Sequence, residues 1–174
     1  MGFLYANGEG VEMNKQEAMK WFTLAANQGY VVAQCALGNY YDHGIGVSEN
    51  KDEAARLYRL AAEQGHAASQ FYLAHYYETG KGVSENIQEA IKWYKLAAEQ
   101  GHVEAQFNLG GFYFHGDGVV EDKQEALKWF KQAADQGHMN AQYATRAAAR
   151  AYIVSDDHVR THSIHRSRGR TSRR

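Results

Sequence analysis

Hydrophobic and polar residues follow a helical period along this chain, and the whole pattern recurs every 36 residues. In Asn50–Gly65 the apolar residues are spaced by three and four, which places them on one stripe of a helix. The segments Asn14–Gly29, Asn86–Gly101 and Asp122–Gly137 have the same pattern. A fixed period of this size is typical of stacked repeats that bury a continuous core between neighbours. The pattern therefore predicts four similar helices, one in each of four successive units.

The ends of these helices are marked by suitable residues. Asn50 can accept hydrogen bonds from free backbone N–H groups, and the Glu53 carboxylate can reach back to the cap, as in a capping box. Gly65 can adopt the left-handed conformation that stops a helix. We expect the same start and stop in the other copies, at Asn14, Glu17 and Gly29, at Asn86, Glu89 and Gly101, and at Asp122, Glu125 and Gly137.

A second helix is predicted between these copies, in Val31–His43, Ser69–Thr79 and Ala105–His115. Its recurring stripe, at positions 33, 37, 40 and 41 of the first copy, is expected to face the core. The link to the next helix contains two glycines and a valine, and such glycines permit a tight turn. Each unit is therefore predicted to be a pair of helices joined by a short turn.

These residues resemble the Sel1-like repeat, a relative of the tetratricopeptide repeat, over about residues 1–142. The matching positions in one copy are Ala33, Leu37, Gly38, Tyr41, Gly44, Gly46, Val47, Ala54, Ala61, Ala62 and Gly65. The resemblance implies an all-α fold, a right-handed α-solenoid of stacked antiparallel helix pairs. It also implies a non-catalytic scaffold or adaptor that presents a concave helical groove to a protein or peptide partner.

The register divides the chain into four parts. Residues 1–32 are a truncated first repeat, 33–140 are three complete repeats, 141–154 are a leftover helix, and 155–174 are an Arg-rich tail that we expect to be disordered. Met1 aligns with Leu37, in the middle of a helix, so we expect a fragment or a misplaced start.

The charge is unevenly distributed between the body and the tail. Residues 1–142 contain eleven Lys and Arg against eighteen Asp and Glu, whereas residues 143–174 contain eight Arg and two Asp. Such a tail is open to three interpretations: a solvated end, a non-native terminus, or a segment that binds nucleic acid or another polyanion. No aromatic residue interleaves with these arginines beyond Tyr152, and base stacking needs such rings.

One stripe of the second helix type does not follow the repeat, at positions 32, 36, 39 and 43 and their equivalents. Positions free of the packing pattern can vary to suit a ligand, and in related solenoids these helices line the concave face. The alternative is an ordinary solvated surface. The candidate partner-binding residues are Asn39, Tyr72, His75 and Asn108.

Catalytic and metal chemistry finds little support in the sequence. Cys35 is interpreted as a small packed hydrophobe, and no nucleophile, base and orienting group recur together. His66, His102 and His138 lie one repeat apart, and helices spaced by roughly 10 Å are too distant to share a metal ion. We therefore expect no cofactor, no metal and no enzyme activity. Family members reported to act on β-lactams are cysteine-rich, unlike this chain, so a hydrolase of that type is a weaker alternative.

The sequence contains no apolar run long enough to span a membrane and no visible signal peptide, and the compartment is left open.

Overall fold

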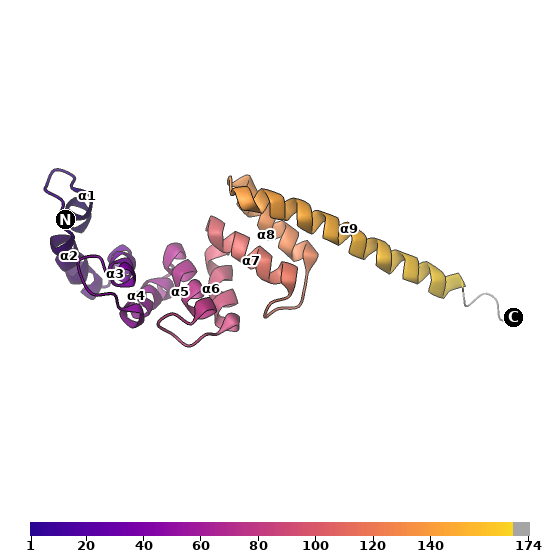
Figure 1. Ribbon diagram of the computed structural model, residues 1–174, viewed down its shortest axis with the longest axis horizontal. Coiled ribbons are helices and arrows are strands. Elements are labelled where there is room, and N and C mark those ends of the chain that lie inside the picture. Colours follow the sequence, from indigo (N-terminus) through magenta and orange to yellow (C-terminus); the bar gives the residue numbers. More distant parts are fainter. Residues whose placement is uncertain (169–174) are drawn as a thin grey trace. The chain divides into compact units, whose positions relative to one another are not determined.

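The computed structural model describes the backbone of residues 1–168 and the side chains of residues 1–153. All regular structure in these residues is helical, which confirms the predicted all-α fold (Figure 1). The helices are α1 (Gly2–Asn7), α2 (Lys15–Asn27), α3 (Val31–His43), α4 (Lys51–Glu63), α5 (Ala67–Thr79), α6 (Ile87–Glu99), α7 (Val103–His115), α8 (Lys123–Asp135) and α9 (Met139–Arg168).

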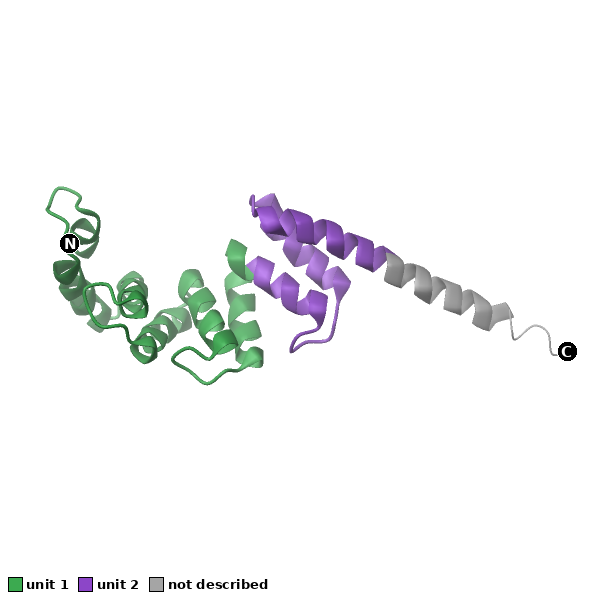
Figure 2. Cartoon of the chain, in the orientation of Figure 1, with its two compact units in different colours: residues 1–105 green, residues 106–174 purple. Residues whose placement is uncertain are grey.

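The chain divides into two units, residues 1–105 and residues 106–174 (Figure 2). In unit 1, each helix from α1 to α6 packs against the next one along the chain. In unit 2, residues of α7 pack on α8 through Phe107 and Phe114, whose rings contact that of Phe130. α8 then packs on α9. Adjacent helices are thus stacked on one another within each unit, as the repeat pattern predicted.

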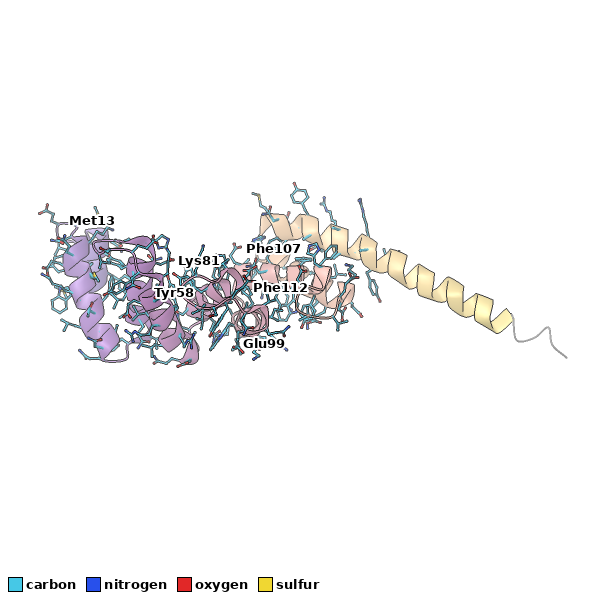
Figure 3. All side chains as sticks on the ribbon, turned by 60° about the horizontal axis from the view of Figure 1, so that its bottom comes forward. Met13, Tyr58, Lys81, Glu99, Phe107 and Phe112 are labelled. Carbon is cyan, nitrogen blue, oxygen red and sulfur yellow. The ribbon has the colours of Figure 1, made fainter. Side chains whose placement is uncertain are left out.

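The predicted apolar stripes face the interior. In α4, Ala54, Leu57, Tyr58, Ala61 and Ala62 are all buried, and Tyr58 lies fully enclosed among the helices of unit 1 (Figure 3). The tryptophans of the later copies also pack inward. Trp129 is 5% exposed, and Trp93 is half-buried against the core cluster of α4 and α5. Burial of these side chains is the main stabilising contribution to the array.

The two helices of a pair approach closely where a glycine on one faces an aromatic ring on the other. A Cβ atom added to Gly38 would lie 2.9 Å from the ring of Tyr58. Gly110 faces Phe130 in the same way, and the added Cβ would lie 2.6 Å from that ring. Real Cβ atoms do not come so close, so a larger residue would push the two helices apart.

Side-chain caps start α2, α4, α6 and α8 as predicted, but the glutamate of the capping box does not reach back to the cap. Asn50 accepts a hydrogen bond from the Glu53 backbone N–H at 3.0 Å. The Asn50 N–H donates to the carbonyl of Tyr41 at 2.9 Å, and the Glu53 carboxylate instead accepts from Arg56. The expectation that the glutamates reach back is therefore wrong, because the preceding helix already satisfies the cap N–H. The same arrangement recurs at the other three caps, Asn14, Asn86 and Asp122.

The predicted glycine stops are confirmed. Gly65 and Gly101 follow the ends of α4 and α6 with φ angles of +87° and +88°. The Gly65 N–H donates to the carbonyl of Ala62 at 2.9 Å, which satisfies one of the free carbonyls at the end of the helix.

Buried glutamines link successive repeats, a feature that the sequence reasoning missed. Gln70 is 4% exposed, and its amide donates to the carbonyl of Ala62 in the preceding repeat at 3.1 Å. Its own amide oxygen accepts from Gln100, at the end of α6, at 2.7 Å. One side chain therefore joins three helices, and Gln34 repeats these contacts with Ala26 and Gln64. Buried polar groups need such partners, so the glutamines restrict how neighbouring repeats can dock.

The last helix continues the stacking and then leaves the repeat pattern. Ala148 of α9 packs on Ala126 and Phe130 of α8. Thr145, which stands where the repeat has leucine, donates from its hydroxyl to the carbonyl of Ala141 at 2.7 Å. The side chains of the predicted tail, residues 155–174, lie outside the described residues. The backbone of α9 is helical as far as Arg168, past the predicted boundary at residue 154. The disorder of residues 169–174 and the division of the chain at residue 154 stay predictions.

The close approach in unit 2 gives a test with an adjacent control. Replacing Gly110 with alanine should lower the free energy of unfolding by about 1–2 kcal/mol, because the new methyl group overpacks against Phe130. Gly111→Ala, one residue later, meets open space and should raise it by about 0.5–1 kcal/mol. Urea unfolding followed by circular dichroism measures both. Equal stabilities for the two variants would contradict this account of the packing.

Candidate functional site

Two of the four predicted partner-binding residues line the same pocket. It has a volume of about 370 Å³ and is formed by residues of α1, α2, α3 and α5, all within unit 1. Asn39 and Tyr72 contribute to it from α3 and α5. Its full lining is Phe3, Ala6, Asn7, Lys15, Phe22, Cys35, Ala36, Asn39, Tyr40, Ile45 and Tyr72.

The other two candidates do not belong to the lining. His75 is half-buried on α5, where its Nδ1 atom lies 3.4 Å from the carboxylate of Glu78. Asn108 is half-buried on α7 in unit 2. The structure therefore brings together Asn39 and Tyr72, and the role predicted for His75 and Asn108 stays a prediction.

The pocket coincides with small residues in the second repeat. Cys35 and Ala36 line it from α3, whereas the equivalent positions of α5 are filled by Phe71 and Tyr72. The Phe71 ring stacks on His102 with 4.6 Å between ring centroids, and the Tyr72 ring stacks on Tyr58 at 4.9 Å. Comparison of the repeats in the sequence could have revealed this missing pair of rings.

The polar residues of the pocket have equivalents 36 positions later in the chain. At those positions a lysine and a tyrosine hydroxyl both donate to one carboxylate. There, Asp42 accepts hydrogen bonds from Lys51 at 2.8 Å and from the Tyr76 hydroxyl at 2.6 Å. Burial opposes ionisation of Asp42, but these two hydrogen bonds, together with the positive charge of Lys51, outweigh it and hold the Asp42 pKa below the usual value. The residues 36 positions earlier are Ala6, Lys15 and Tyr40, which all line the pocket. The pocket thus has the cation and the hydroxyl of this set without its carboxylate.

Lys15 and Tyr40 are left without that carboxylate. Lys15 donates to the backbone carbonyl of Ala6 at 2.9 Å, as Lys51 does to the carbonyl of Asp42, but no carboxylate of the described residues pairs with it. The hydroxyl of Tyr40 is buried and has no hydrogen-bond partner among the described residues. An ammonium group has three donors, so Lys15 retains hydrogen-bonding capacity for a ligand.

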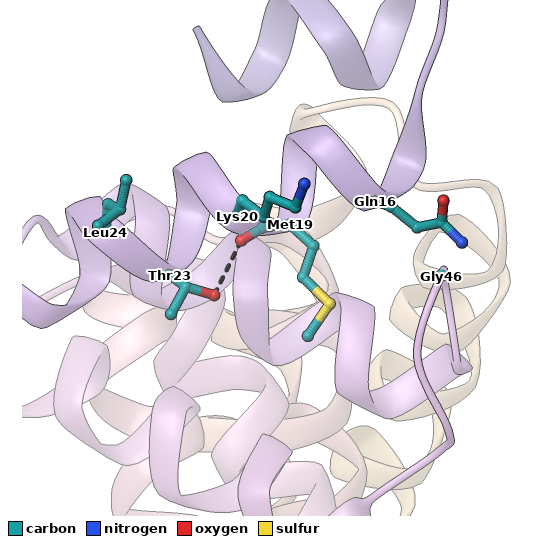
Figure 4. Close-up of a pocket in the computed structure, with 6 residues that line it drawn as sticks. All are labelled: Gln16, Met19, Lys20, Thr23, Leu24 and Gly46. Atoms are coloured by element: carbon teal, nitrogen blue, oxygen red, sulfur yellow. Dashed lines mark hydrogen bonds between the residues drawn. The ribbon is translucent and has the colours of Figure 1, made fainter.

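A second hollow lies along α2 and has little specific chemistry. Its volume is about 560 Å³, and it is lined by Gln16, Met19, Lys20, Thr23, Leu24 and Gly46 (Figure 4). The Thr23 hydroxyl donates to the carbonyl of Met19 at 2.8 Å and is satisfied. Leu24 is 56% exposed, but its equivalents Leu60 and Leu96 are also exposed. This exposure is therefore a general property of the repeat.

Comparisons with known proteins agree with the repeat pattern. A sequence model of the Sel1 repeat matches residues 1–30, 31–66, 67–102 and 103–138. The chain belongs to the Sel1 repeat family. The curated Sel1-like repeat-containing protein L21 of Acanthamoeba polyphaga mimivirus is 48% identical over 40 residues, which are 23% of this chain and 8% of that protein.

Solved Sel1 structures have the same helical-solenoid fold. A Sel1 repeat protein from Oxalobacter formigenes is 40% identical, with a TM-score of 0.79, over 83% of this chain and 57% of that chain. A protective antigen of uropathogenic Escherichia coli, c5321, is 33% identical with a TM-score of 0.79, over 84% of this chain and 32% of that one. Cysteine-rich protein B of Helicobacter pylori shares the fold at 22% identity and a TM-score of 0.59, over 78% of this chain and 97% of that one.

The chain therefore spans about half and about a third of the first two of these solved chains, and a small part of the curated relative. Sel1 repeat proteins are generally non-catalytic scaffolds for protein interactions.

The histidines that follow the glycine stops cap helices in these Sel1 repeats. The N–H of Ala105 donates to Nδ1 of His102 at 3.3 Å, and the N–H of Ala141 donates to His138 at 3.1 Å. His66 caps α5 in the same way through Ser69. No group of three or more potential metal ligands occurs in the described part of the chain. The capping role gives these histidines a structural function that the sequence reasoning did not anticipate.

Ser69 and His66 form a hydroxyl–imidazole pair that is not arranged for nucleophilic catalysis. The Ser69 hydroxyl lies 2.9 Å from Nδ1 of His66, but Ser69 is fully buried and the histidine is occupied as a cap. Burial raises the pKa of the Cys35 thiol, although a hydrogen bond with Ser69 opposes this. A raised pKa disfavours the reactive thiolate, which supports the interpretation of Cys35 as a packed hydrophobe.

Within the described residues, no helix is both long and apolar enough to span a bilayer.

The cap at His102 predicts that stability depends on pH. Burial lowers the pKa of His102, which outweighs the opposing effect of Glu104. The unfolded chain, with a histidine pKa of about 6.5, then binds the proton more tightly than the folded chain. The stabilisation is therefore complete above about pH 6.5 and is lost as the pH falls from there through the lower folded-state pKa.

His102→Asn retains a cap acceptor without titrating and should flatten this part of the pH profile. His102→Gln should also flatten the pH profile. Its free energy of unfolding should be about 1 kcal/mol lower than that of His102→Asn at every pH, because glutamine is a poor cap. Urea midpoints between about pH 5 and pH 8 measure the effect. A slope that is unchanged in both variants would show that His102 does not contribute to the pH dependence.

Proposed function

We propose that this chain is a non-catalytic binding module that holds a protein or peptide segment on the face lined by α1, α3 and α5. The observation that supports this most directly is the shared pocket of Asn39 and Tyr72. Both residues occupy the stripe that does not follow the repeat, whereas the core positions of the same helices recur. Sel1 repeat proteins generally bind other proteins, and we assign that interaction to this face.

A preformed array is suited to this task. Before any partner binds, α1, α3 and α5 are already held in place. Buried glutamines with satisfied hydrogen bonds and close helix contacts at glycines hold them. A face of this kind loses little conformational entropy when a partner binds, so a small number of side chains can provide affinity. Tyrosine and asparagine also combine apolar contact with hydrogen bonding, and Tyr72 adds a large ring to the pocket wall.

The two other functions considered gain no support from the described residues. Polyanion binding depends on arginines whose side chains lie outside them. A β-lactam hydrolase needs an accessible nucleophile, and Ser69 and Cys35 do not provide one.

The proposal is tested with a displayed library of random peptides selected on the intact chain. Dissociation constants of enriched peptides are then measured by fluorescence anisotropy for the wild type and for Asn39→Arg. The substitution places a large charged group in the pocket, and we expect affinity to fall by at least about tenfold, as for a central interface residue.

The control is Asn27→Arg, which makes the same change at an exposed residue that does not line the pocket. It should leave affinity within about twofold, since surface changes away from a contact have small effects. Peptides that bind both variants as well as the wild type would show that this face is not the binding site. Circular dichroism verifies that both variants retain the helical fold.

A further inference from the structure

We propose that the pocket of Asn39 and Tyr72 is a carboxylate site, which takes an acidic side chain of an extended protein segment together with a large apolar neighbour. This inference rests on the proposed function and adds the chemistry of the partner. It follows from a comparison of two repeats within the molecule: a carboxylate present in one is replaced by a methyl group in the other, and the pocket lies at that position.

The second repeat provides the template for the site. Its Asp42 carboxylate accepts from the ammonium group of Lys51 and from the hydroxyl of Tyr76. Lys51 also donates to the backbone carbonyl of Asp42, which holds the ammonium group close to this carboxylate. A single carboxylate thus satisfies two donors that come from different helices, α4 and α5.

The equivalent positions 36 residues earlier, Lys15 and Tyr40, provide the same donors without an acceptor. Lys15 donates to the Ala6 carbonyl, as Lys51 does to that of Asp42, and the Tyr40 hydroxyl is buried without a partner among the described residues. Tyr40 is only 6% exposed, and it is among the residues that line the pocket. The Tyr58 hydroxyl and the indole N–H groups of Trp93 and Trp129 are also buried without a partner among the described residues, but of these four residues Tyr40 is the one that lines the pocket. An unsatisfied buried hydroxyl is unfavourable. A carboxylate from a partner would accept from both Lys15 and Tyr40.

The remainder of the pocket favours an apolar group beside that carboxylate. Phe3, Phe22, Ile45 and Tyr72 form its walls, and Lys15 is the charged residue among those that line it. The volume of about 370 Å³ is within the range of sites that bind small ligands, and it exceeds what a carboxyl group alone would fill. The small residues Cys35 and Ala36 leave room where the next repeat has rings of its own. The expected occupant is therefore an aromatic or aliphatic residue adjacent to Asp or Glu.

The first test needs no ligand. Ala6→Asp introduces the missing carboxylate, and it should raise the melting temperature of the whole chain. Ala6→Asp in a Tyr40→Phe and Lys15→Met background should lose this gain, because the two donors are absent. An Ala6→Asp chain that melts no higher than Ala6→Asn would contradict the assignment of these donors.

A pair of tyrosine variants makes the same comparison with the smallest change. Tyr76→Phe removes a hydroxyl that is bonded to Asp42 and should lower the melting temperature. Tyr40→Phe removes an unpartnered hydroxyl and should leave it unchanged or raise it. Equal losses in the two variants would overturn the claim that Tyr40 lacks an acceptor.

The second test uses defined probes, with binding followed by NMR titration of the isotope-labelled chain. The blocked peptide acetyl-Gly-Phe-Glu-Gly-amide should bind about tenfold more tightly than the same peptide with Gln, since hydrogen bonds to charged groups are the stronger ones. It should also bind more tightly than the peptide with Ser in place of Phe. The resonances of Ala6, Asn39 and Tyr40 should shift, and Ala6→Asp should abolish the preference for Glu.

The outcomes separate this inference from the proposed function. If Gln and Glu peptides bind equally and Asn39→Arg weakens both, the face binds peptides and the carboxylate assignment is wrong. A further probe is acetyl-Gly-Phe-Gln-Gly with a free carboxyl terminus. If this peptide binds and the amidated Glu peptide does not, the site takes a main-chain carboxylate and the side-chain assignment is wrong. If neither these peptides nor those of the random library bind to this face, both proposals are wrong.

Discussion

The close docking of neighbouring helices within each unit is the interaction on which the rest of this structure depends. Alanine, glycine and aromatic residues recur in register, so that a ring from one helix packs against the backbone of its partner, as Tyr58 does at Gly38. Such packing is possible only if the helices begin and end at fixed points, which the caps and glycines determine. Short-range contacts between neighbours thereby build an array without long-range pairing of distant segments.

Because the repeats are alike, the same few polar groups need hydrogen-bond partners in each of them. The cap N–H groups bond to tyrosine carbonyls of the preceding helix, and the buried glutamines join one repeat to the next. Because these contacts recur, the repeats provide internal references for one another. A position that departs from the reference, such as Ala6 opposite Tyr40, reveals a group whose partner is missing.

The proposed binding site combines positions that packing leaves free with positions that the repeat pattern occupies. Asn39 and Tyr72 were recognisable from the sequence because their stripe does not recur, while the flanking core positions do. Lys15 and Tyr40 were not recognisable in the same way, since both occupy places that the repeat pattern explains. The role proposed for them rests on the contact across repeats that Asp42 makes and Ala6 cannot.

The sequence by itself determined the helices, their ends and the buried stripes, because these depend on residues three or four positions apart in the same segment. It also indicated Asn39 and Tyr72 as partner-binding candidates, whereas His75 and Asn108 lie outside the lining of their pocket. Only the tertiary structure decided that the cap N–H groups bond to the preceding helix, which leaves each glutamate free to pair with the lysine or arginine three residues later in its own helix. It alone placed Ala6, Lys15 and Tyr40 in one pocket. The physical reason is that hydrogen bonds between helices depend on how the links orient neighbouring segments, which a periodic pattern does not encode.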